Sequence, residues 1–228
     1  MSKKVLILLS GSGVYDGTEI QEATLTLLAL HQRGIEYQCA APNENQFHVI
    51  NHTNGEEIET PRNMMVESAR IARGDIKDAS LVAMDEYDGL VIPGGFGAAK
   101  NFSSWAFDGP KAKIQSEVKR LILEAHQNKK PILAMCMAPV LVSLAFAGSA
   151  TEPIVTVGTE KEATPYEIGA ISEGMESLGS KVNQVGVHAV VVDEPNKTIT
   201  TPCYMMEASI SDIFEGISKA TDELKKFL

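Results

Sequence analysis

The sequence contains few cysteines, no paired-cysteine motif and no long apolar run. Its three cysteines, Cys39, Cys136 and Cys203, are too few for a disulfide framework and lack the Cys-x-x-Cys spacing of zinc or redox sites. We therefore expect a protein of a reducing compartment, the cytoplasm. No apolar run approaches the roughly 18 residues of a membrane span, and the short apolar stretch after the basic amino terminus leads directly into a Gly-rich turn. That stretch predicts a buried first strand and not a signal sequence.

Positive charge is also scarce. The chain has 20 Lys and Arg against 30 Asp and Glu, a formal net charge of −10, and no concentrated basic segment. Because polyanions bind through clustered basic residues, we expect neither nucleic acid nor an anionic membrane surface as a partner. No group of His, Cys, Asp and Glu has metal-ligand spacing, so neither a metal nor a cofactor is predicted.

What the chain does have is a regular alternation of short apolar runs and helix-length amphipathic stretches over its 228 residues. This alternation predicts an α/β fold, with a mostly parallel central sheet covered by helices on both faces, in a single domain spanning 1–228. We expect strands at 5–9, 35–40, 89–92, 132–135, 154–157, 189–192 and 198–201, and helices at 18–33, 61–73, 111–126, from 139, at 164–178 and at 210–227. The strands at 189–192 and 198–201 are predicted to form a hairpin. The segment at about 47–88 is predicted to be an elaboration between two core strands.

Cys136 stands between an apolar strand-like run and Pro139, which starts a second apolar stretch. If a strand ends and a helix begins there, the sulfur lies near a helix N-terminus, whose positive dipole end favours a thiolate. Ligands of open α/β sheets bind beyond the carboxyl ends of the strands, which makes Cys136 a candidate nucleophile. The alternative is a buried cysteine that only fills space, as we expect for Cys39.

A glycine-rich loop at 93–99 follows another apolar run and contains Gly94 and Gly95. Glycine lets a backbone approach closely and present an amide instead of a side chain. We predict that the amides of Gly95 and Met137 bind an oxyanion beside Cys136, with Gly94 in the substrate pocket. A tight strand-to-helix turn without a ligand explains the motif equally well.

The first predicted strand is followed by a third loop, which leads into a helix. Thr18 and Gln21 have the spacing of a capping box, so we expect this helix to begin at Thr18. Glu19 would then lie in the first turn and offset the helix dipole. Glu19 and Gly13 are also candidates for the substrate pocket.

Glu22 differs from Glu19 because on a helix it shares a side with Leu25 and Ala29 and so borders apolar surface. A carboxyl group removed from water there tends to stay protonated near neutral pH. Such a group can donate a hydrogen bond to a neighbouring thiolate or transfer a proton, which makes Glu22 a candidate catalytic acid.

The histidines are less informative. His188 is a candidate for the pocket if a late loop brings it to Cys136, but a structural histidine at a strand start is the main alternative. His52 stands in a polar turn and is a weaker candidate.

Together these motifs resemble the ThiJ/PfpI superfamily, the deglycase, glyoxalase and class I amidotransferase-like proteins. More narrowly, the chain resembles the enhancing-lycopene-biosynthesis protein 2 family, also called isoprenoid biosynthesis protein or glyoxalase ElbB. The stretches that carry the resemblance are 10–23, 49–56, 93–101, 135–139 and 191–202. The resemblance implies a flavodoxin-like three-layer αβα sandwich of the class I glutamine amidotransferase-like type, and a homodimer.

By this resemblance Cys136 takes the nucleophile position and Glu22 that of the glutamate hydrogen-bonded to it, while Gly95 and Met137 supply oxyanion amides. Many superfamily enzymes have a histidine shortly after the cysteine, and glutamine amidotransferases have a late His-x-Glu; this chain has neither. We therefore expect neither amidotransferase nor protease activity.

The activity implied is that of a glyoxalase. A small 2-oxoaldehyde, methylglyoxal or glyoxal, would form a hemithioacetal on Cys136 and become a 2-hydroxy acid through proton transfer by Glu22, without glutathione. The alternatives are a cysteine-based redox or stress sensor and a regulatory protein linked to isoprenoid biosynthesis.

Overall fold

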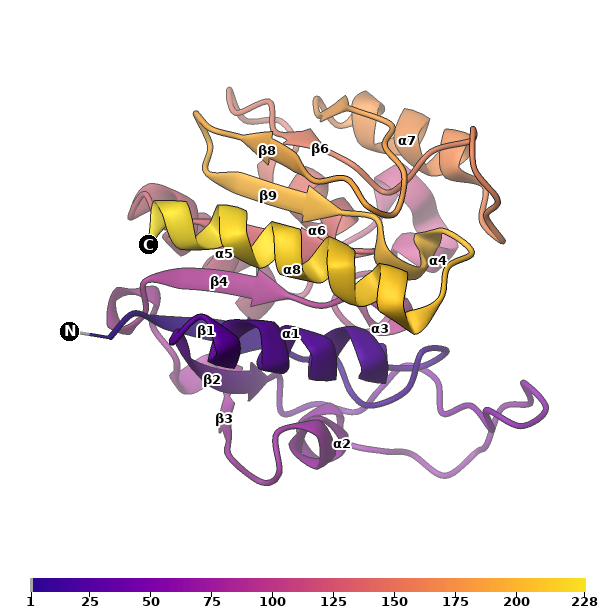
Figure 1. The fold of residues 1–228 in the computed structure, drawn as a ribbon. Coiled ribbons are helices and arrows are strands. Elements are labelled where there is room, and N and C mark those ends of the chain that lie inside the picture. The colour runs from indigo at the N-terminus through magenta and orange to yellow at the C-terminus, as the bar shows by residue number, and fades with distance from the viewer. Residues whose placement is uncertain (1) are drawn as a thin grey trace.

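The computed structural model describes residues 2–228 and shows a twisted seven-stranded sheet with the strand order β3-β2-β1-β4-β5-β9-β8 (Figure 1). The strands of this sheet are β1 (Lys4–Leu8), β2 (Glu36–Ala41), β3 (Ile76–Asp78), β4 (Gly89–Ile92), β5 (Ile132–Met135), β8 (Val191–Asp193) and β9 (Thr198–Thr201). All neighbours pair in parallel except β8 and β9, which are antiparallel. A separate two-stranded parallel sheet consists of β6 (Ile154–Val155) and β7 (Lys181–Val182).

The helices lie in two layers around the sheet. They are α1 (Ile20–Gln32), α2 (Met64–Ile71), α3 (Phe96–Lys100), α4 (Trp105–Asp108), α5 (Ser116–Gln127), α6 (Pro139–Phe146), α7 (Ile168–Ser177) and α8 (Ile210–Phe227). Helices α1 and α8 pack side by side over one face of the sheet, and α5 and α6 lie behind the opposite face (Figure 1). The predicted α/β class with a mostly parallel sheet is therefore confirmed.

The central strands explain why the sequence reads as apolar runs instead of alternating patterns. Strands β4 and β5 are buried at every position, and β1 at every position after Lys4. A parallel sheet covered on both faces requires side chains of both faces to be apolar. In α5, by contrast, only the positions at helical spacing are buried, namely Val118, Leu121, Ile122 and Ala125.

Four predicted helix starts lie too early in the chain, including that of α2, which begins at Met64 and not at 61. The first helix begins at Ile20, because the Thr18 hydroxyl accepts a hydrogen bond from the Ser10 amide (2.7 Å) and the Glu19 carboxylate caps the helix instead. Helix α5 begins at Ser116 and not at 111, since the Gln115 side chain caps it by accepting from the Val118 amide (2.9 Å). Helix α7 begins at Ile168 because the preceding residues are tied to another segment by side-chain hydrogen bonds. Polar side chains used in tertiary contacts thus displaced the predicted caps.

The segment at 47–88 contains more regular structure than predicted. Its helix is shorter than expected, with Asn63 as the N-cap, and β3 adds an edge strand to the main sheet beside β2. The late hairpin is present as β8 and β9, but β6 is only two residues long and pairs with β7, which the sequence did not predict. In α8, Ile210 is half exposed, so the apolar stripe begins at Ile213.

The topology also fixes where a site can form. Strands β1, β4, β5 and β9 run in the same direction, so the loops that follow them emerge at the same edge of the sheet. These loops carry residues 9–19, 93–96, 136–138 and 202–206. Residues far apart in the sequence therefore meet beyond the carboxyl ends of the strands.

Candidate active site

Cys136 occupies a strained turn directly after β5. Its φ angle is +55°, in the left-handed region that residues with a Cβ seldom adopt. The Cys136 amide donates to the Thr201 carbonyl (3.0 Å) and the Ala138 amide to the Met135 carbonyl (2.8 Å), and α6 then begins at Pro139. This turn holds the sulfur at the sheet edge, and the side chain is only 5% exposed. Strain retained at a buried nucleophile position is typical of functional turns.

Glu22 reaches the same point from the first turn of α1, and it is fully buried. One carboxyl oxygen accepts a hydrogen bond from the Gly94 amide (3.0 Å) and the other from the Tyr204 amide (3.2 Å). Two fixed amides therefore hold the carboxyl group against the Cys136 thiol, with which it interacts.

Gly94 fills the narrow space between Cys136 and Glu22. A Cβ atom at this position would lie 2.3 Å from the Cys136 Cβ, 2.8 Å from its Sγ and 2.7 Å from the Glu22 Oε2. No side chain fits there, so glycine is required for spatial reasons. At Gly95 the requirement is also conformational, because its φ angle is +101°.

The amides of Gly95 and Met137, which the sequence predicted as an oxyanion-binding pair, both face the Cys136 sulfur. Their effect on the thiol pKa is downward, but it is smaller than the upward effect of burial. They would equally face negative charge on an oxygen attached next to the sulfur. That catalytic role remains a prediction, whereas the convergence of the two amides on one atom is a property of the fold.

Burial has the largest effect on the pKa values of Glu22 and Cys136. Removal from water, with the neighbouring Glu19 charge second, raises the pKa of Glu22 to about 8, against the opposing effect of the Tyr204 and Gly94 amides and the Cys136 thiol. Glu22 is thus largely protonated at neutral pH. Burial first, and the Glu22 charge second, also raise the pKa of the Cys136 thiol well above its usual value.

The thiol pKa corrects one expectation from the sequence. The helix N-terminus was expected to favour a thiolate, but desolvation of a sulfur beside an acidic side chain outweighs that effect in the unliganded site. The pKa of Glu22, about 8, lies below that of the thiol, so Glu22 loses its proton first and the Cys136 thiol keeps its proton to higher pH. An ionised Glu22 beside a protonated thiol can therefore act as the base that takes the thiol proton.

We predict that the alkylation rate of Cys136 by iodoacetamide keeps rising with pH through pH 9 and does not level off near pH 8, because burial and the Glu22 charge raise the pKa of the Cys136 thiol well above its usual value. The measurement is peptide mass mapping over a pH series, which separates Cys136 from Cys39, whose thiol pKa burial raises to about 12.

The matched variant is Glu22→Gln, with its fold checked by circular dichroism because one of the two amides loses an acceptor. Because the Glu22 charge and its hydrogen bond raise the thiol pKa, Cys136 in this variant should be alkylated faster than in wild type at pH 9. An unchanged pH profile would show that another group controls the thiol.

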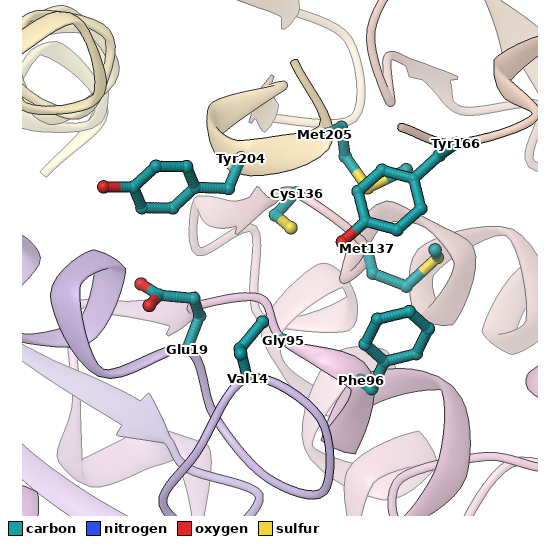
Figure 2. Close-up of a pocket in the computed structure, with 9 residues that line it drawn as sticks. All are labelled: Val14, Glu19, Gly95, Phe96, Cys136, Met137, Tyr166, Tyr204 and Met205. Carbon is teal, nitrogen blue, oxygen red and sulfur yellow. The ribbon is translucent and has the colours of Figure 1, made fainter. Parts of the chain in front are cut away.

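A small cavity opens directly onto Cys136 (Figure 2). The centre of a water-sized sphere has only about 10 Å³ of room in it, so the cavity is far smaller than a drug-sized ligand pocket and suits a small molecule. It is lined by Val14, Glu19, Gly95, Phe96, Cys136, Met137, Tyr166, Tyr204 and Met205. Toward the surface it continues into a wider depression that shares Val14, Glu19, Tyr166 and Tyr204. No lysine, arginine or histidine lines the cavity.

Sequence reasoning missed five of these lining residues. Val14 and Phe96 stand inside loops that were singled out for their glycines, so proximity to a motif was the only signal for them. Tyr166, Tyr204 and Met205 come from late segments with no motif of their own. Only the placement of β9 beside β5 brings Tyr204 to Glu22.

The remaining pocket candidates had different outcomes. Glu19 does line the cavity, and burial raises its carboxyl pKa. Gly13 does not line it; its φ of +140° shapes the loop beneath His52 and so positions Val14. His52 accepts a hydrogen bond from the Tyr15 amide (3.2 Å) and has a structural role in that loop.

The prediction of His188 as a pocket residue was wrong. Its imidazole is 49% exposed and lies 3.5 Å from Asp212 and 3.4 Å from Glu215, both on α8. The carboxylates of a surface helix therefore hold this side chain away from Cys136. Within residues 2–228, no group of three His, Cys, Asp or Glu is arranged to hold a metal ion. In the same part of the chain, no helix combines the length and apolar character needed to cross a membrane.

Comparison with known proteins gives close relatives over nearly the whole chain. The chain is 44% identical over 216 residues to the rat protein named ES1 protein homolog, mitochondrial, covering 94% of this chain and 80% of the relative. It is equally 44% identical to human glutamine amidotransferase-like class 1 domain-containing protein 3, mitochondrial, covering 94% and 79%. Among solved structures, an isoprenoid biosynthesis protein with an amidotransferase-like domain from Ehrlichia chaffeensis has a TM-score of 0.89 at 32% identity and covers 99% of both chains.

These names contradict the expectation of a cytoplasmic protein. Both curated relatives are described as mitochondrial. The expectation rested on cysteine content, which separates reducing from oxidising compartments but cannot distinguish one reducing compartment from another.

The solved relative matches the architecture derived above and confirms the class I glutamine amidotransferase-like, flavodoxin-like fold. A model of the DJ-1/PfpI family matches residues 3–207, which include every loop that builds the cavity. This chain belongs to the DJ-1/PfpI family.

Proposed function

We propose that the protein is a glyoxalase-like enzyme that converts small 2-oxoaldehydes, such as methylglyoxal and glyoxal, to 2-hydroxy acids without glutathione. The observation that carries this proposal is the Cys136–Glu22 pair, a buried thiol and a largely protonated carboxyl group in contact at the floor of a small cavity. A nucleophile and a proton carrier are the two groups that this internal redox reaction requires.

The reaction begins from the site with Glu22 ionised: Glu22 takes the thiol proton while the Cys136 sulfur adds to the aldehyde carbon and forms a C–S bond, and Glu22 then gives that proton to the aldehyde oxygen. The product is a hemithioacetal, and Glu22 is now a carboxylate able to act as a base. It removes the proton from the same carbon and returns it to the neighbouring carbon through an enediol, while the hydroxyl proton of the first carbon moves to the oxygen of the second. The former aldehyde is thereby oxidised to a thioester and the ketone is reduced to an alcohol. Water hydrolyses the thioester, which releases the 2-hydroxy acid and restores the thiol.

The charge of the cavity supports neutral substrates. No cationic side chain lines it, whereas the Glu19 carboxyl does. A 2-oxoacid would bring a carboxylate into a site without a counter-charge, which is costly, and the 2-hydroxy acid product would be bound weakly for the same reason. We therefore expect aldehydes without a carboxylate to be preferred over glyoxylate.

The test is an assay of the purified full chain with methylglyoxal in the absence of glutathione, with enzymatic detection of lactate. The protein should form lactate, and prior alkylation confined to Cys136 should stop it. Absence of lactate formation from untreated protein, or equal rates before and after alkylation, contradicts the proposal.

A redox sensor based on Cys136 is the alternative. It is less favoured because sensor cysteines are exposed and have a depressed thiol pKa, whereas Cys136 is 5% exposed and its thiol pKa is raised. Selective oxidation of Cys136 by dilute peroxide, detected by mass spectrometry in a protein that forms no lactate, would support this alternative. A role in isoprenoid biosynthesis is suggested only by the name of the Ehrlichia relative. The homodimer stays a prediction.

A further inference from the structure

We propose that the Tyr166 hydroxyl donates a hydrogen bond to the second carbonyl oxygen of a 2-oxoaldehyde held on Cys136, and so selects dicarbonyl compounds over simple aldehydes. This inference rests on the proposed function and assigns the substrate-recognition group of the same site.

Tyr166 is positioned to contact a bound ligand. Its ring lines the cavity together with Cys136, and its hydroxyl points inward toward the sulfur and Met137 (Figure 2). The hydrogen bonds that residues 2–228 make at Tyr166 involve only its backbone: its amide donates to Thr164 Oγ1 (3.1 Å), and its carbonyl accepts from the Ile168 amide (2.9 Å). The hydroxyl is thus available to a ligand.

The backbone around Tyr166 is fixed, so the hydroxyl is held in place before a ligand binds. The Thr164 hydroxyl donates to the Met205 carbonyl (2.6 Å), and the Glu207 amide donates to the Ala163 carbonyl (2.9 Å). The ring packs edge-on against Phe96, with 5.9 Å between centroids. A preorganised donor loses less conformational entropy on binding than a mobile one.

The oxygen of the second carbonyl group of the substrate is the one for which the two amides provide no hydrogen bond. The Gly95 and Met137 amides face the sulfur, so they serve the oxygen on the carbon that bonds to it. The neighbouring carbonyl lies one bond further into a cavity without lysine, arginine or histidine. Among the lining residues, the other side-chain hydroxyl is that of Tyr204, which is already bonded to Gln21 and points away from the sulfur (Figure 2).

Tyr166 also keeps its proton under all conditions in which the site would work. Burial, followed by the charges of Cys136 and Glu22, raises its pKa to about 12. It therefore donates a hydrogen bond to the carbonyl oxygen, and to the enediol oxygen that develops from it, without giving up the proton.

The experiment compares wild type, Tyr166→Phe and Tyr37→Phe by two readouts. The first is protection of Cys136 from iodoacetamide by methylglyoxal and by propanal, which has the same number of carbons but lacks the second carbonyl. The second is the kcat and KM of lactate formation. Tyr166→Phe keeps the ring against Phe96 and removes only the hydroxyl. Tyr37→Phe is the matched control because Tyr37 lies in β2 and does not line the cavity.

In Tyr166→Phe, the methylglyoxal concentration for half protection should rise at least about tenfold, and kcat should fall about 10- to 100-fold. Protection by propanal, alkylation without aldehyde and all readouts of Tyr37→Phe should stay within about twofold of wild type. Equal losses with propanal and methylglyoxal, or no loss with either, overturn the role of Tyr166.

The outcomes also separate this inference from the proposed reaction. If wild type forms no lactate but methylglyoxal protects Cys136, and only Tyr166→Phe loses that protection, the recognition role stands and the reaction fails. If lactate forms at the same rate in wild type and Tyr166→Phe, the reaction stands and the recognition role fails. If neither aldehyde protects wild-type Cys136, both fail.

Discussion

Replacement of Cys136 by alanine is expected to lower lactate formation from methylglyoxal by at least about 10³-fold, to the rate measured without protein. The reason is that no other thiol and no amine side chain lines the cavity, and every later step takes place on the carbon attached to the sulfur. Replacement by serine should have nearly the same effect, since a hydroxyl at this site loses its proton far less readily than a thiol. The measurement is lactate formed over time at saturating methylglyoxal.

Cys39→Ala provides the matched control. Cys39 is also a buried free cysteine, but it lies in β2 away from the cavity, so its removal should leave kcat within about twofold of wild type. The Cys136 variants should remain folded by circular dichroism, because the side chain changes by only one atom. More than about a tenth of wild-type activity in folded Cys136→Ala would rule out covalent catalysis by this residue.

Replacement of Gly94 by alanine should be the second most damaging change. The added Cβ would lie 2.3 Å from the Cys136 Cβ and 2.7 Å from the Glu22 carboxylate oxygen, and neither group can retreat because both are buried. The thiol and the carboxyl must separate, or the 93–96 loop must move and lose the Gly94 hydrogen bond to Glu22. We expect a loss of lactate formation of at least about 100-fold and a decrease of about 1–3 kcal/mol in the free energy of unfolding.

The control for this prediction is Gly169→Ala, in α7. There the added Cβ would meet only the end of the exposed Glu160 side chain (2.6 Å), which can move aside, and alanine favours a helix by up to about 1 kcal/mol. This variant should be at least as stable as wild type in urea unfolding and fully active. Wild-type activity in Gly94→Ala would show that the Cys136–Glu22 contact can be widened without consequence.

The elements that the sequence predicted well are those whose signal is local. The apolar runs that became β1, β4 and β5 identified the central parallel strands, because a strand buried on both faces must be apolar at consecutive positions. The first residues of α1, α5 and α7 were less predictable. Their caps depend on whether a polar side chain such as Thr18 is occupied by a distant backbone group.

The site residues likewise divide into those that local sequence signals predicted correctly and those that they did not. Cys136, Glu22, Gly95 and Met137 belong to loops at strand ends or to the helix that follows one, and the direction of parallel strands brings such loops together. The same reasoning about loops predicted His188 in the pocket, but its imidazole lies beside the carboxylates of α8 at the surface. Sequence spacing contains no information about that competition.

The sequence by itself determined the α/β class, the direction of the central strands and the cysteine–glutamate pair, since each depends on short segments whose chemistry is visible in the chain. Only the tertiary structure decided that the cavity is closed by Tyr166, Tyr204 and Met205, and that the buried pair holds its protons more tightly than the helix dipole alone would suggest. The physical reason is that burial and long-range contacts set both properties, and both arise only when β9 and the segment before α7 pack over the end of β5.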